Sequence, residues 1–423
     1  MMLRNNIYRW SSRLLLTGGA QVAVQFLGFA AGLIIIRFLT PIEYAYYTLA
    51  LATLGMLTVL SDAGVSMGLM ALGGPCWTNP ARLGAIFTEA RRFRRILSVV
   101  ALILALPVLA FMLTEQKSSV LNSVLICLAL LPLFLFTVTS QLRESLLKLS
   151  QQIAALQLLQ VAGGAVRVLM LAVGLGFWPA AWVAVLLAGV VQLVVNAPLQ
   201  RLIKPLVQSA GPVEEETRTT YRNYVRRSLP GALYYAFSGQ INVWLISLLG
   251  GAESIAQVGV AGRLAAACSV ISAVVGLIFV PRFSRAQWSV RQQLGILFLV
   301  IGGVLLCGLG AIAVLRLWPG LIPMLVGEKY STLGEVVAWS IASAILGIAS
   351  GIAFNIAAVK GYIMNPLAAV GLPVLSMAIS FSLIGASTPL QVFQMNTLYS
   401  GLVFIAFTLY ATRKLSIHKI QSA

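Results

Sequence analysis

Charged residues are scarce in this sequence. They make up 9% of its 423 residues, while 59% are hydrophobic and the mean hydropathy is +0.94. A typical soluble domain has about 25% charged residues, which it needs to cover a water-facing surface. The composition therefore excludes an ordinary soluble protein.

Residues that bind metals or perform acid–base chemistry are also rare. His418 is the only histidine, and none of the four cysteines belongs to a C-x-x-C or Cys/His cluster. No phosphate-binding loop of the Walker A type is present, which excludes an ATP-driven pump. The polar stretches are too short to form a separate catalytic domain. We predict no enzymatic activity, no metal and no cofactor.

Long apolar runs are what the sequence has instead. They recur from residue 14 to residue 412, and a membrane-spanning helix needs about 20 apolar residues. We predict twelve spans, at residues 14–36, 45–72, 96–113, 120–140, 153–175, 177–198, 229–250, 258–281, 294–315, 333–359, 362–385 and 390–412. The first run lacks the small-residue cleavage site of a signal peptide. Residues 316–332 include Trp318, Pro319 and Pro323, and we interpret this segment as interfacial.

Basic residues are distributed unevenly between the two sides of these spans. There are 29 lysines and arginines against 11 acidic residues, a net charge of +18. With the N-terminus in the cytoplasm, 23 basic residues fall on the cytoplasmic side and four on the other side. Cytoplasmic loops are rich in Lys and Arg, so we predict that both termini are cytoplasmic. Because these charges are spread over many short loops, we exclude a nucleic-acid partner.

The longest polar stretch divides the spans into two equal sets. It covers residues 199–228. We therefore predict an all-α polytopic membrane protein with an N-terminal six-helix bundle (1–198), a cytoplasmic linker (199–228) and a C-terminal six-helix bundle (229–423). An even number of spans in each half gives both halves the same orientation, which is typical of a parallel repeat.

Short motifs occur at the ends of several predicted spans. Residues 37–44 read R-F-L-T-P-I-E-Y, and the next span ends in S-D-A-G at residues 61–64. Residues 258–264 read V-G-V-A-G-R-L, residues 280–285 read V-P-R-F-S-R, and residues 326–330 read V-G-E-K-Y. In order and spacing, over nearly the whole chain, they resemble the polysaccharide-export flippase branch of the multidrug/oligosaccharidyl-lipid/polysaccharide (MOP) superfamily.

This resemblance implies a bacterial inner-membrane flippase. Two helical bundles would enclose a central cavity and rock between inward-open and outward-open states. The cargo would be an undecaprenyl-diphosphate-linked oligosaccharide, such as an O-antigen, capsule or exopolysaccharide repeat unit. Membrane lipids and other polysaccharide-assembly membrane proteins are the expected partners. The chain departs from the family in span 7, where many relatives have an acidic residue but residues 238–242 read S-G-Q-I-N.

Arg167 is the strongest candidate for binding the diphosphate. It lies about 14 residues into its span, on one helix face with Gln157, Gln160 and Gly164. Such a face lines a cavity or packs against a neighbouring helix. The arginine favours the cavity, because intramembrane charges usually mark substrate pathways. Its guanidinium can also bind a phosphate with two parallel hydrogen bonds.

Other polar residues in the spans have two interpretations each. Arg263 binds the cargo or reaches the outer interface as an anchor. Arg37 ends span 1, and a structural cap or anchor is favoured over ligand contact. Gln21 and Gln25 hold sugar hydroxyls, or their glycine-rich face packs against another helix. Asn242 lies on a polar face of span 7 that would form a wall of the cavity.

Asp62 is the only acidic residue that we place inside a span. It is a candidate for ion coupling, but the alternative is an interfacial position with hydrogen bonds to a helix end.

The basic run at 91–95 is expected to anchor the cytoplasmic surface to anionic lipid, or to gather anionic substrate. A drug/cation antiporter of the same superfamily is the main alternative function. It would need a buried carboxylate, and Asp62, near the end of its span, is the only one that the predicted spans offer. A membrane scaffold without transport activity is the third.

Overall fold

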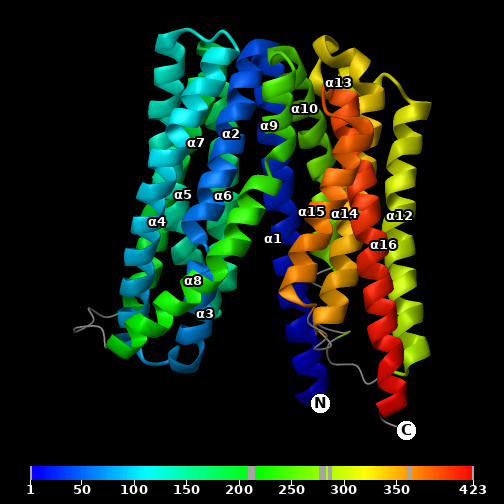
Figure 1. The fold of residues 1–423 in the computed structure, drawn as a ribbon. Helices are drawn as coiled ribbons and strands as arrows, with labels where there is room; N and C mark the ends of the chain where they lie inside the picture. The colour runs from blue at the N-terminus through cyan, green and yellow to red at the C-terminus, as the bar shows by residue number, and fades with distance from the viewer. Residues whose placement is uncertain (1, 208–214, 276–282, 284–287, 360–363, 422–423) are drawn as a thin grey trace. The chain divides into compact units, whose positions relative to one another are not determined.

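The computed structural model describes residues 2–207, 215–275, 283, 288–359 and 364–421. Every regular element in these ranges is a helix (Figure 1). Eleven helices are long and apolar enough to cross a membrane, or twelve if Leu229–Ser238 and Ile241–Leu249, bent by 49°, form one span. The predicted all-α fold with about twelve spans is confirmed.

Contacts divide the chain into two units, Met1–Glu253 and Ser254–Ala423. The first contains α1 (Met2–Phe38), α2 (Pro41–Asp62), α3 (Val65–Gly73), η1 (Gly74–Cys76), α4 (Pro80–Glu115), α5 (Val120–Leu149), α6 (Ile153–Phe177), α7 (Ala181–Ile203), η2 (Lys204–Leu206), α8 (Glu215–Ser238) and α9 (Ile241–Leu249). The second contains α10 (Ala252–Ala265), η3 (Ala266–Cys268), α12 (Val290–Leu317), α13 (Leu321–Val326), η4 (Glu328–Leu333), α14 (Gly334–Val359), α15 (Pro366–Ile384) and α16 (Pro389–Gln421). The first two residues of α10 belong to the first unit.

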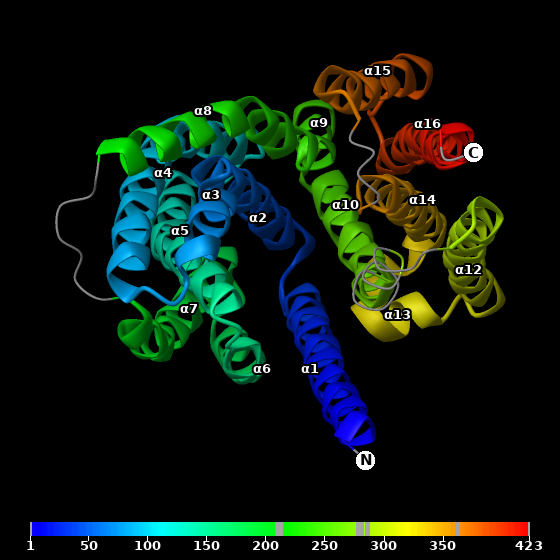
Figure 2. The same cartoon turned by 90° about the horizontal axis from the view of Figure 1, so that it is seen from below.

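The contact division falls later in the chain than the polar stretch 199–228. Helix α8 lies across α2, α3 and α4, and α9 contacts α2 (Figure 2). Both helices therefore pack with the first unit, although we assign residues 229–250 to the second bundle from the sequence. The boundary at 199–228 stays a prediction about topology.

Several helices begin at side-chain caps that are readable in the sequence. The Thr40 hydroxyl accepts a hydrogen bond from the Glu43 amide (3.3 Å), and Pro41 follows it. Asn79 before Pro80 and Ser119 before Val120 cap α4 and α5 in the same way. These caps pair backbone N–H groups that would have no partner at a helix start.

Helices α4 and α5 are among those that extend beyond the predicted spans. Helix α4 begins at Pro80 and α5 continues to Leu149, so the basic residues at 82–95 and 143–148 lie on helices rather than in loops. Hydropathy reports only the part of a helix within hydrocarbon, so it does not detect polar helical ends.

In segment 316–332, α13 has six residues and is too short to cross a membrane.

One hydrophobic core cluster of the first unit lies where α3, α4, α5, α7 and α8 meet. Leu69, Leu83, Leu146, Leu199 and Tyr221 are among its buried side chains. Helix α1 packs along α6 outside this core. In the second unit α14 packs between α12 and α16, with its Phe354 ring 5.2 Å from Phe407.

Helices α5 and α7 approach each other closely at Gly189. A Cβ atom added there would lie 2.9 Å from the backbone nitrogen of Leu133, a contact that side-chain motion cannot relieve. At Gly28 on α1, by contrast, an added Cβ would have no heavy atom of another described element within 4 Å. The two helical glycines therefore form a matched pair for testing the packing.

We expect Gly189→Ala to lower the free energy of unfolding by about 1–3 kcal/mol, because it overpacks the α5–α7 contact. Gly28→Ala should not lower it, since alanine is the better helix former by about 1 kcal/mol. Denaturant titration of the detergent-solubilised protein measures both. Equal stability of the two variants would contradict the close approach of α5 and α7.

Candidate functional site

The long second span is broken at residues 63–64. Ala63 and Gly64 both have left-handed backbone conformations, with φ of 32° and 85°, so α2 ends at Asp62 and α3 starts at Val65. The Asp62 carboxylate accepts hydrogen bonds from the backbone N–H of Ser66 (3.2 Å) and from its hydroxyl (2.6 Å). A negative charge is favourable here, because the start of a helix carries partial positive charge.

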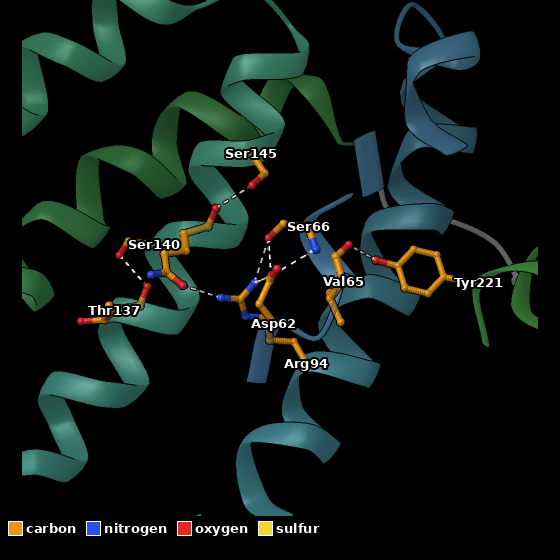
Figure 3. A network of polar contacts seen from close by, with 9 residues as sticks. Asp62, Val65, Ser66, Arg94, Thr137, Ser140, Ser145 and Tyr221 are labelled. Atoms are coloured by element: carbon orange, nitrogen blue, oxygen red, sulfur yellow. Dashed lines mark hydrogen bonds and ion pairs between the residues drawn. The ribbon is translucent and has the colours of Figure 1, made fainter. Parts of the chain in front are cut away.

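A buried arginine joins this break to two other helices (Figure 3). Arg94 of α4 donates to Asp62, with which it forms an ion pair, and to the Ser66 hydroxyl (2.9 Å). Its other terminal nitrogen donates to the side-chain oxygen of Gln141 on α5 (2.6 Å). One guanidinium therefore fastens α2, α3 and α5 to α4. We call Asp62, Ser66, Arg94 and Gln141 the break network.

Tyr221 of α8 supports the same break from another side. Its hydroxyl donates to the backbone carbonyl of Val65, and its ring stacks on Phe93 with 5.6 Å between centroids. The side chain is fully buried. Burial, followed by the negative charge of Asp62, raises the pKa of the Tyr221 hydroxyl. The hydroxyl therefore stays protonated and remains a donor to α3.

The interpretation of the basic run at 91–95 as a surface anchor is wrong for Arg94. Its exposed fraction is 3%, whereas Arg91, Arg92 and Arg95 are exposed. The reason is helical periodicity: Arg94 shares the buried face of α4 with Ala90 and Ser98. Because α4 has one buried face, four arginines within five residues of it do not all point to the surface.

Asp62 lies at the end of α2 and is hydrogen-bonded to the start of α3, and its position relative to the membrane interface stays a prediction. Its carboxylate is 30% exposed and ion-paired to Arg94. Its role as an ion-coupling residue stays a prediction.

Other carboxylates of the first unit also have partners. Glu43, from the motif after span 1, accepts hydrogen bonds from the Ala181 backbone N–H at the start of α7 (2.7 Å) and from Asn122 (3.1 Å). Buried Glu89 pairs with Arg218 (3.4 Å), and Glu144 lies near Lys148 (3.8 Å). We placed Glu89 and Glu144 in loops, so the sequence missed that both lie on helices. Their partners are structural groups of the protein itself.

The polar face of α6 packs partly against neighbouring helices. Gln157 is buried, and Gln160 donates to Glu144 of α5 (3.1 Å). An added Cβ at Gly164 would lie 3.1 Å from the Leu27 side chain of α1. This part of the face therefore contacts α5 and α1, and the same α1 carries the half-buried Gln21 and Gln25.

Arg167 differs from its neighbours on that face. It is half-buried, and its Nε is buried without a hydrogen-bond partner. In the described part of the chain Arg167 forms no hydrogen bond and no ion pair. An intramembrane guanidinium without a counter-charge carries a free-energy penalty that a bound anion would remove.

The remaining predicted residues lie on separate elements. Arg37 is exposed in the last turn of α1, and Asn242 of α9 has a buried side-chain oxygen with no hydrogen-bond partner among the described residues. Arg263 is half-buried on α10 in the second unit. The structure thus places Gln21 and Gln25 on α1, which packs along α6, whereas Arg37 lies in the last turn of α1 and Asn242 and Arg263 lie on α9 and α10.

Arg143 of α5 is a polar residue that the sequence did not single out. Its guanidinium donates to the backbone oxygen (2.9 Å) and side-chain oxygen (2.8 Å) of Asn196 on α7, and to Gln200 (3.2 Å). The sequence does carry a sign that α5 continues, because no proline or glycine separates Arg143 from the end of apolar span 4. Extending the predicted helix by one turn would have included Arg143.

This arrangement of helices occurs in solved transporter structures. The structure of lipid II flippase MurJ in an inward closed conformation aligns with a TM-score of 0.74 and 12% identity, covering 96% of this chain and 91% of that one. The chain has the fold of the MOP superfamily. An inward-facing multidrug-resistance MATE transporter of that superfamily aligns with a TM-score of 0.70 and 14% identity, covering 94% and 96%.

A third similar structure is the MATE multidrug transporter DinF-BH, with a TM-score of 0.61 and 15% identity over 95% of this chain and 94% of that one. No protein-family model matches the sequence, and no curated protein matches it. The comparisons therefore show the fold alone, which this chain shares with a lipid flippase and with drug transporters.

The ion pair of the break network can be tested by removing its carboxylate. Asp62→Ala leaves the Arg94 side chain, 4% exposed, without its counter-charge. We expect a loss of about 3 kcal/mol in the free energy of unfolding. The additional change Arg94→Met should restore part of that loss, because it removes the unpaired charge.

Glu215→Ala is the matched control. Glu215 also pairs with an arginine (Arg218, 2.9 Å) but is 68% exposed, so its loss should cost less than about 1 kcal/mol. Denaturant titration in detergent compares the variants. Equal losses for Asp62→Ala and Glu215→Ala would contradict a structural role for the buried pair.

Proposed function

We propose that this protein is a flippase for undecaprenyl-diphosphate-linked oligosaccharides. It moves an O-antigen, capsule or exopolysaccharide repeat unit from the cytoplasmic to the outer leaflet of the bacterial inner membrane by alternating access, with both termini in the cytoplasm. The observation that carries this proposal is Arg167, a half-buried guanidinium on α6 with no partner among the described residues.

The distribution of charge within the helices supports an anionic cargo. Arg167 is unneutralised, while the carboxylates of Asp62, Glu43 and Glu144 are bound by groups of the protein. A diphosphate needs cationic donors, and guanidinium binds phosphate oxygens through two parallel hydrogen bonds. Arg263 and Arg37 are further cations for the diphosphate path in this proposal.

Neutral groups supply the sugar contacts. Gln21 and Gln25 lie on α1, which packs along α6, and both are half-buried. Amide side chains donate and accept hydrogen bonds, which suits sugar hydroxyls. Gln157, Gln160 and Asn242 complete the proposed set. The fold similarity to a protein described as a lipid II flippase adds support, because that protein moves a lipid-linked cargo.

A drug/cation antiporter is the second candidate, because MATE multidrug transporters have the same fold. In that function a carboxylate exchanges a cation for the drug, and Asp62 is the residue proposed for it. Its ion pair with Arg94 weighs against this role, since a cation would have to displace a buried guanidinium.

The test is the pool of lipid-linked oligosaccharide in host cells depleted of the protein. We expect diphosphate-linked repeat units to accumulate on the cytoplasmic leaflet, and wild-type protein to clear them. Arg167→Ala should slow clearance about 10–100-fold, because a hydrogen bond to a charged group contributes about 1.5–3 kcal/mol. Arg316→Ala, which removes an exposed arginine at the end of α12, should behave like wild type.

Other outcomes would overturn the proposal. An unchanged lipid pool together with increased sensitivity to cationic dyes would favour the antiporter, and Asp62→Asn should then abolish dye resistance. Full clearance by Arg167→Ala, at equal protein level, would remove Arg167 from the cargo path. Normal surface polysaccharide without the protein would exclude the flippase function.

A further inference from the structure

A pocket of about 320 Å³ lies between α4 and α5 in the first unit. Four arginines line it: Arg91, Arg94 and Arg95 from α4, and Arg143 from α5. By the distribution of basic loops, these helix ends are on the cytoplasmic side. The pocket is formed within one unit, and neither Arg167 nor any other residue proposed to bind the cargo contributes to its lining.

Three residues of the pocket lining carry polar atoms without hydrogen-bond partners. The Nε atoms of Arg94 and Arg143 and the hydroxyl oxygen of Ser98 are all buried, and none has a hydrogen-bond partner in the described part of the chain. Arg94 and Ser98 are 3% and 5% exposed. Buried polar groups are nearly always hydrogen-bonded, so atoms of this kind around a cavity indicate a missing ligand. The two Nε–H groups are donors, so the ligand must supply acceptor oxygens.

The charge of the pocket specifies an anion. Arg91, Arg95 and Arg143 form no ion pair with any described carboxylate, while Arg94 pairs through its Nη1 with Asp62, which is not part of the lining. Arg91 instead lies over the Phe87 ring (5.0 Å to the centroid), and Arg143 is bound to the neutral Asn196 and Gln200. The lining therefore has an excess of positive charge that only a bound anion can balance.

The other half of the lining is apolar and open. Val99 and Leu135 are 51% and 48% exposed, and they continue into the exposed apolar surfaces of α4 and α5 that face the membrane. A small soluble anion would gain nothing from this surface. A molecule with a phosphate at one end and acyl chains at the other fits both halves.

We propose that this pocket binds the phosphate group of an anionic glycerophospholipid from the cytoplasmic leaflet. The phosphate oxygens accept hydrogen bonds from Arg94, Arg143 and Ser98, while Arg91 and Arg95 close the pocket at the membrane surface. The acyl chains lie along Val99 and Leu135. Because Arg94 also holds Asp62 and Ser66, lipid binding strengthens the break network.

The experiment uses the full-length protein in detergent and measures the binding of phosphatidylglycerol by native mass spectrometry. Arg91 and Arg95 are exposed, so Arg91→Gln with Arg95→Gln leaves the fold intact. We expect about 30-fold weaker binding in this double variant, because each basic residue near a lipid phosphate contributes about 1 kcal/mol. Arg82→Gln with Arg92→Gln is the control, since it removes the same charge from exposed positions of α4 outside the pocket.

Four results would overturn the proposal. An equal loss of affinity in the control would show only a general attraction of the basic surface. Equal binding of zwitterionic phosphatidylethanolamine, or displacement of the lipid by inorganic phosphate alone, would contradict recognition of an anionic lipid. Tighter binding of undecaprenyl diphosphate than of phosphatidylglycerol, lost in the same double variant, would assign the pocket to the cargo instead.

Discussion

The ion pair between Arg94 and Asp62 stabilises the second span where it is broken between α2 and α3. Two left-handed residues at 63–64 interrupt the second span, and a break within a span leaves backbone groups that must find partners. Asp62 supplies acceptors for α3, Arg94 neutralises Asp62, and Gln141 and Tyr221 bring α5 and α8 to the same place. Removing either charge leaves the other without its counter-charge at the junction of five helices, which ties the core of the first unit to this pair.

The same guanidinium connects two environments. Its terminal nitrogens bind the break network, and the same residue belongs to the lining of the pocket between α4 and α5. Arg94 is therefore common to the pocket and to the break. In the proposed lipid binding, a ligand in the pocket acts on the orientation of Arg94 and through it on the joint between α2 and α3. This coupling is physical contact through one residue, and it needs no longer pathway.

The sequence predicted what depends on hydrophobicity. Spans followed from apolar length. The starts of α2 and α4 did not, because we began the corresponding spans at residues 45 and 96, although the caps Thr40 and Asn79 are present in the sequence. It did not predict which face of α4 is buried, because four arginines within five residues look alike until the helix register is known. It also missed that α5 continues past its apolar part, so Glu144 and Arg143 were read as loop residues. Tertiary contacts decide such polar helix ends, and hydropathy does not report them.

The proposed function depends on how charge is arranged along the spans. Glu43 binds the start of α7, while Arg167 forms no hydrogen bond or ion pair among the described residues, and in the proposed function it binds the cargo. The most direct measurement uses purified protein in proteoliposomes loaded with an undecaprenyl-diphosphate-linked oligosaccharide, and follows the accessibility of the sugar to a lectin outside. The account predicts that sugars from the inner leaflet become accessible far faster than in protein-free vesicles. If they stay inaccessible while a cationic dye crosses the same vesicles, the flippase account is wrong.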